Sequence, residues 1–177
     1  MGLQFENLDS ATRALMLEEI DRDMSGRGLY TSSYLNDQGA ARWPTLLRNA
    51  AAEGSDDTLA VALNAEHCFK QQVERRKKNG GYSMVAVPYT AAQTLAESQF
   101  NMYYMRALSR RAIDEDLSVT IYRAKEVQRP REESERLIGT QIDPQIVLES
   151  LRETLGVEPS IGIPLPNSGL TITLGKP

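Results

Sequence analysis

The sequence predicts an α+β fold: a helix-dominated single domain with a small β-sheet and an extended C-terminal arm that ends in a β-strand. Helix-favouring residues run without a break over 91–114, and β-branched and aromatic residues gather in two short runs on either side, 82–87 and 118–124. The apolar, proline-punctuated stretch 157–177 is too short to build a core. We therefore expect a globular domain over 1–156 and an arm over 157–177.

Length and composition place the chain among ordinary globular proteins. Its 177 residues are 41% hydrophobic and 25% charged, and a chain of this size buries enough surface to fold without disulfides or a structural metal. Cys68 is the single cysteine and the first residues lack a secretory signal, so we expect a cytosolic origin. No apolar run approaches the roughly 18 residues that span a bilayer, so membrane insertion is not expected.

The first helix is expected to begin at Asp9 or Ser10, since either side chain can accept the free N–H groups of a first helical turn. It should run to about Asp23 and end at Gly26 and Gly28. Its apolar positions predict a buried stripe of Ala11, Ala14, Leu15, Leu17 and Ile20. Its charged positions predict a solvated face of Glu18, Glu19, Asp21, Arg22 and Asp23.

The next segment is less regular. Residues 29–37 fit either a short strand or a loop. Trp43 and Pro44 predict a boundary with a new helix after it, because proline disfavours a helical residue before it. Ser55 predicts the cap of a further helix that grades into the basic run 75–78 and an Asn-Gly-Gly turn.

The longest helix is expected to be central to the core. A strand over 82–87 is closed by Pro88, and we expect it to form a small sheet with 118–124 against the longest helix. Thr90 with Gln93 three residues later matches a capping box and predicts the start of the 91–114 helix. This helix is apolar on more than one side, so other elements should surround it.

The C-terminal part contains two more predicted strands and a helix. Residues 118–124 read as a strand, and 126–139 as a charged connection broken by proline. Asp143 as cap and Pro144 at the first position open the last helix. In the arm, 170–174 alternates Leu or Ile with Thr, which is typical of a strand with one apolar face.

No residue pattern identifies a catalytic site. His67 and Cys68 are adjacent, and neighbours on a helix point about 100° apart, so a catalytic pair is not expected and a small buried thiol is. Too few Cys and His residues are available for a metal site of that kind. The acidic clusters at 18–23 and 114–116 are expected to be solvated surface, although paired carboxylates also serve metal-dependent enzymes.

One basic run could contact nucleic acid: Arg75, Arg76, Lys77 and Lys78. Arg106, Arg110 and Arg111 could extend the patch. A solvated helix end is the favoured interpretation, because cations there meet the negative end of the helix dipole. The net charge of −4 argues against a protein built mainly to coat nucleic acid.

The long connection at 125–136 mixes both signs of charge, which suits a salt-bridged subunit contact better than nucleic acid. We therefore name Arg129 and Arg131 as candidate partner contacts.

Three stretches of the chain resemble uncharacterised proteins encoded by tailed bacteriophages and prophages. These are residues 100–112 (FNMYYMRALSRRA), 121–131 (IYRAKEVQRPR) running into 134–139, and 166–170 (PNSGL). The similarity extends over most of the chain, including the opening Phe-Glu-Asn-Leu, and brings no catalytic motif with it. It implies a virion protein of the head or of the head-to-tail connection.

The leading hypothesis is a non-enzymatic structural component of a phage virion that acts through subunit contacts and has no cofactor. Subunits of such shells exchange extended arms, so the remaining candidate partner contacts are Ile161, Ile163, Leu165, Leu170, Ile172 and Leu174. The competing arrangement folds 170–174 back onto its own domain, beside 118–124 or 82–87. A nucleic-acid-binding phage protein and, behind it, a carboxylate-dependent metalloenzyme are the alternatives. We expect a homo-oligomer.

Overall fold

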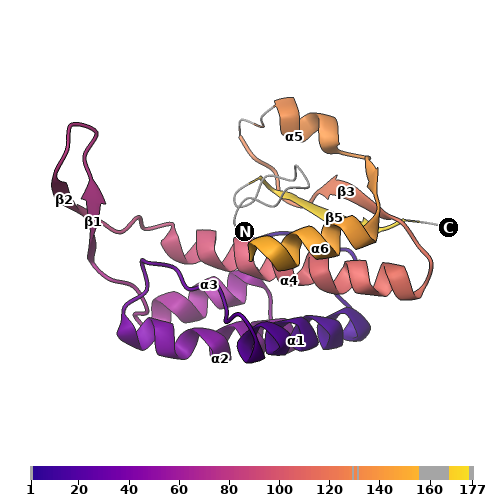
Figure 1. Cartoon of the computed structure of the whole chain (residues 1–177), viewed down its shortest axis with the longest axis horizontal. Helices are drawn as coiled ribbons and strands as arrows, with labels where there is room; N and C mark the ends of the chain where they lie inside the picture. Colours follow the sequence, from indigo (N-terminus) through magenta and orange to yellow (C-terminus); the bar gives the residue numbers. More distant parts are fainter. Residues whose placement is uncertain (1, 129, 131, 156–167, 176–177) are drawn as a thin grey trace.

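The computed structural model describes residues 2–128, 130, 132–155 and 168–175, and has the predicted α+β class (Figure 1). Six helices and five strands lie in these residues: α1 (Ser10–Ser25), α2 (Asp37–Glu53), α3 (Asp56–Ala65), β1 (Gln72–Arg76), β2 (Tyr82–Ala86), α4 (Ala91–Asp114), β3 (Val119–Arg123), α5 (Glu132–Leu137), β4 (Gln141–Ile142), α6 (Pro144–Thr154) and β5 (Leu170–Leu174). None of the helices in this described part of the chain is long and apolar enough to cross a bilayer.

Helix α4 runs through the middle of the fold, with α1, α2 and α3 on one side and α6 with a three-stranded sheet on the other (Figure 1). Its predicted boundaries are confirmed, and most of its residues are buried. The predicted capping box is wrong: Thr90 is helical and makes no cap hydrogen bond. Gln93 instead uses its Nε2 to donate to Glu97 Oε1 (2.7 Å) and Asp57 Oδ1 (3.2 Å).

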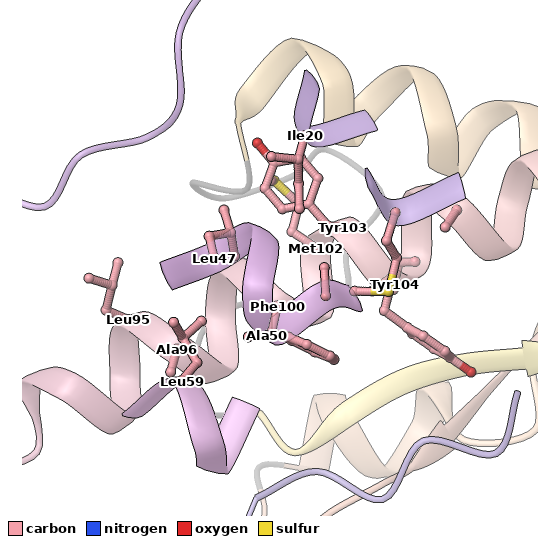
Figure 2. Close-up of a cluster of buried hydrophobic side chains, with 14 of the residues drawn as sticks. Ile20, Leu47, Ala50, Leu59, Leu95, Ala96, Phe100, Met102, Tyr103 and Tyr104 are labelled. Atoms are coloured by element: carbon pink, nitrogen blue, oxygen red, sulfur yellow. The ribbon is translucent and has the colours of Figure 1, made fainter. Parts of the chain in front are cut away.

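The core is a continuous apolar cluster built around α4 (Figure 2). Phe100 and Tyr103 of α4 are fully buried, as are Ile20 of α1, Leu47 of α2 and Leu63 of α3. Helices α1, α2 and α3 each contribute an apolar face to this cluster. Helix α4 is apolar on several sides and is stable here because its neighbours cover those sides.

The arm strand β5 pairs with its own chain. It lies antiparallel to β3, with Ile172 opposite Ile121, and β4 borders the other edge of β3. Of the two arrangements left open by the sequence, the structure has the one in which 170–174 folds back. The expected place of 82–87 in this sheet is wrong, since β2 belongs to a separate hairpin.

Helix α1 begins as predicted, with Asp9 Oδ1 accepting from Thr12 N–H (3.0 Å). The predicted division of its faces is right for Ile20, which is buried, and for Glu18, Asp21 and Arg22, which are exposed, but wrong for four other residues. Ala11 and Ala14 are exposed, whereas Glu19 and Asp23 are buried. The two carboxylates can be buried because Arg106 on α4 forms ion pairs with both of them.

Helix α2 contradicts the boundary predicted at Pro44, because it begins at Asp37 and continues through this proline. Asn36 caps it by accepting from Gly39 N–H (2.7 Å). Trp43 is 1% exposed and its Nε1–H donates to Tyr30 O (2.9 Å). Tertiary packing of the apolar face thus outweighs the hydrogen bond that proline removes.

The segment after α3 is a β-hairpin, not the predicted extension of a helix. Helix α3 ends at Ala65, and the basic run lies on β1 and in the turn that follows. Gly80 (φ +86°) and Gly81 (φ +77°) supply the left-handed backbone that reverses the chain. Residues 29–34 form turns and coil, with one isolated bridge between Leu35 and Phe69.

Candidate functional site

The hairpin β1–β2 stands away from the helices at one end of the fold (Figure 1). Residues 70–89, which we call the hairpin arm, include both strands and their flanks. Backbone and side-chain bonds fix its base to the loop before α2, since Lys70 N–H donates to Tyr34 O (2.9 Å) and Lys70 Nζ to Ser33 O (3.0 Å). The arm therefore has an anchored base and a free tip.

One face of the arm is exposed along its whole length. Residues opposite each other in an antiparallel pair share a face, and three such pairs occupy this one: Gln72 with Ala86, Glu74 with Met84, and Arg76 with Tyr82. All six are exposed, Tyr82 by 62% and Met84 by 58%. Tyr89, just beyond β2, is 96% exposed. This face presents the apolar side chains of Tyr82 and Met84 beside one cation, Arg76, and one anion, Glu74, with no cover from the rest of the described chain.

Both edges of the hairpin are open. Val87 N–H donates to Gln71 O (3.0 Å) and Lys77 N–H to Gly81 O (2.9 Å). Because hydrogen-bonded and non-bonded pairs alternate, the backbone groups of Gln72, Glu74 and Arg76 point away from β2. No third strand adds to this sheet among the described residues. An extended segment of another chain could therefore pair with it.

The charge of the arm opposes that of the rest of the chain. Residues 70–89 contain five Lys or Arg and one Glu, a net charge of +4, whereas the whole chain carries −4. The remaining residues therefore carry −8. The four predicted cations are exposed, and none forms an ion pair with a residue that the structure describes: Arg75, Arg76, Lys77 and Lys78. Their charge is available to a partner.

A groove of about 700 Å³ lies at the base of the arm. Both strands and the loop residues Ser33 and Tyr34 line it, and the strand residues include the partly buried Val73 and Val85. The base of the arm thus has a groove with mixed polar and apolar lining, and its tip is cationic.

The other predicted basic residues do not extend this surface, so that expectation is wrong. Arg106 is fully buried, with Nη2 at 2.6 Å from Glu19 Oε2 and Nη1 bound to Asp23. Arg110 binds Glu18 and Glu19, and Arg111 binds Asp9 and Glu115. These arginines hold helices together.

The buried ion cluster joins three elements: Glu19 and Asp23 from α1, Arg106 from α4 and Arg152 from α6. Burial alone would raise the pKa of Glu19, but the hydrogen bonds and charges of Arg152 and Arg106 outweigh it and lower this pKa. Glu19 is therefore ionised at neutral pH, and the groups of the cluster pair with one another.

The candidate partner contacts of the arm at 157–177 divide into two sets. Leu170 and Ile172 are fully buried in the core of their own chain, and Leu174 N–H donates to Asn7 Oδ1 (3.0 Å). The other three, Ile161, Ile163 and Leu165, lie outside the described residues, as do the candidate contacts Arg129 and Arg131 of the connection 125–136. In this structure β5 is part of the domain.

Within the described ranges no cluster of three His, Cys, Asp or Glu side chains could hold a metal ion. Cys68 is buried as predicted, and burial raises the pKa of its thiol. His67 is exposed and has a left-handed backbone (φ 51°) after the end of α3. One side chain of the adjacent pair is thus exposed and the other buried.

The sequence predicted the cations of the arm, the strand at 82–87 and the Asn-Gly-Gly turn, but not the strand β1 or the exposed face of Tyr82 and Met84. An Asn-Gly step is typical of a hairpin, but β1 contains one β-branched residue, Val73, and so gives a weak strand signal. Comparison with protein-family models, with curated protein sequences and with solved structures gives no match.

Proposed function

We propose that this chain is a non-enzymatic structural component of a phage virion, and that it acts through protein–protein contacts made by the hairpin arm. One observation carries the contact role: a hairpin with two open edges and an exposed face of Tyr82, Met84 and Arg76 projects from the folded body. Three sequence stretches resemble proteins of tailed phages. This resemblance supports a role as a virion protein of the head or of the head-to-tail connection.

Physical chemistry supports a contact role for the arm. Two-stranded hairpins are marginally stable in water, and exposed strand edges invite pairing with another chain. Tyr, Met and Arg are also the residues enriched where proteins meet. The arm presents these features at one place, so its stable form in the virion is expected to be a bound one.

Nucleic-acid binding by the same arm is the second candidate. The four cations of the tip could neutralise phosphates, and Tyr82 could stack on a base. The −8 carried by the rest of the chain opposes this role, because it repels a polyanion. Protein contacts are therefore the favoured proposal.

The proposal is tested in particles of the phage or prophage that encodes the chain. Quantitative mass spectrometry of gradient-purified particles should find the chain at a fixed copy number. A variant in which residues 72–86 are replaced by Asn-Gly should be expressed but absent from particles, or should stop assembly. A chain that is abundant in the lysate and missing from purified particles would overturn the virion role.

A further inference from the structure

The exposed face of the hairpin arm needs a cover that the rest of the described chain does not give. Val73, Ser83 and Val85 on one face are partly buried, whereas every residue of the opposite face is exposed. Burying Tyr82 and Met84 would remove apolar area from water, with a gain of about 25 cal/mol for each Å². The occupant must also tolerate the neighbouring cations.

The charge distribution identifies the kind of occupant. The arm carries +4 and the remaining residues −8, so the body of a second copy of this chain has a net charge opposite to that of the arm. Two arms placed face to face would bring like charges together, which disfavours a symmetric arm-to-arm contact. The favoured contact joins the arm of one copy to the acidic body of the next.

We propose that the hairpin arm docks on the acidic body of a second copy, so that each copy gives one arm and receives one. This inference rests on the proposed assembly role and names the partner. Such a head-to-tail contact forms a ring if its rotation closes and an open filament if it does not. The body remains competent to receive an arm when its own arm is removed.

An arm-free variant gives the decisive test. Gln71 and Val87 are joined by a backbone hydrogen bond (3.0 Å), so a two-residue Asn-Gly turn can replace residues 72–86 and close the stub. We expect the full chain to form oligomers in light scattering and the arm-free chain to be a folded monomer by circular dichroism. Adding excess arm-free chain should break the oligomers into capped, smaller complexes that contain both chains.

Charge variants test the electrostatic part of the contact. Lys77→Gln with Lys78→Gln should weaken self-association about tenfold or more, and added salt should weaken it for the full chain. Arg22→Gln with Arg136→Gln is the matched control, because it removes the same charge from exposed positions outside the arm. Because it makes the body more negative, this control should associate at least as tightly as the full chain.

Each remaining outcome counts against the inference. Oligomers that arm-free chain cannot cap would indicate an arm-to-arm contact. A full chain that stays monomeric overturns self-docking but leaves the virion role, which particle mass spectrometry tests separately. If the monomer binds labelled double-stranded DNA in fluorescence anisotropy, with an affinity that falls steeply with salt, then nucleic acid is the occupant.

Discussion

Arg106 carries its charge in a place that water does not reach. Its guanidinium lies between Glu19 and Asp23, and Tyr103 donates its hydroxyl hydrogen to Asp23 Oδ2 (2.9 Å). Arg152 reaches Glu19 from α6. Buried charges are costly unless they are paired and hydrogen-bonded. Here the two arginines donate hydrogen bonds to the carboxylates and neutralise their charge. Removal of one partner should therefore cost more than an exposed ion pair would.

Arg106→Met should lower the free energy of unfolding by about 3–5 kcal/mol, because Asp23 and Glu19 would be left buried with too few partners. Urea denaturation at neutral pH measures this loss. Arg136→Met is the control, since Arg136 forms an exposed pair with Glu132 on α5 and should change stability by less than about 1 kcal/mol. Equal effects of the two substitutions would contradict a stabilising role for the cluster.

The lowered pKa of Glu19 predicts a pH dependence of stability. A carboxylate whose pKa falls on folding adds stability above its unfolded value, about 4.3, and loses it as the pH drops through the lower folded value. Glu19→Gln should be less stable than the wild type at pH 7, and this difference should shrink between about pH 4.3 and lower pH. Urea midpoints across this range measure it; a difference that is constant with pH would contradict the prediction.

This residue-scale arrangement was not predictable from one sequence. Glu19 and Asp23 occupy helix positions that look solvated, because a charge is normally exposed. Their burial depends on Arg106, which is 83 residues or more away along the chain. Helical periodicity reports only local neighbours, so a compensating charge on another helix leaves no local signal.

At the scale of elements, the hairpin arm should fold and unfold without consequence for the body. Its two strands pair only with each other in the described chain, and its tip is fully exposed. Replacing residues 72–86 by Asn-Gly should change the unfolding free energy of the monomer by less than about 1 kcal/mol. Urea denaturation at low protein concentration measures this. Ile121→Ala provides the contrast, because Ile121 of β3 is part of the buried core; this substitution should lower the unfolding free energy by about 2–5 kcal/mol.

The sequence predicted elements well where local signals agreed and poorly where tertiary contacts decided. The bounds of α4 and β5 followed from composition and spacing, and Asp143 with Pro144 marked the start of α6. The helix boundary predicted at Pro44 was wrong, because burial of the helix face that contains Trp43 stabilises α2 across this proline. The hairpin arm was predicted only in part. Its cations are visible in the sequence, but the pairing of β2 depends on β1, which has little β-branched character.

At the scale of the whole molecule, β5 completes the domain from the far end of the chain. Leu170 and Ile172 are fully buried beside β3, and Asn101 Nδ2 on α4 donates to Leu170 O (2.9 Å). Composition could predict that this segment needs a surface to dock on, but not which copy of the chain supplies it. Strand exchange and intrachain pairing would bury the same side chains, so only a dependence on concentration separates them.

The arm-free chain makes this separation clean, because it lacks the contact that we propose for self-association. If β5 pairs within its own chain, the urea midpoint of the arm-free chain should stay constant over about a hundredfold range of protein concentration. An exchanged β5 would make this midpoint rise with concentration, since unfolding would then also separate the copies. Ile172→Ala in the same background should lower the unfolding free energy by about 2–5 kcal/mol at every concentration. A midpoint that shifts with concentration would contradict intrachain pairing and return the C-terminal strand to the assembly contacts.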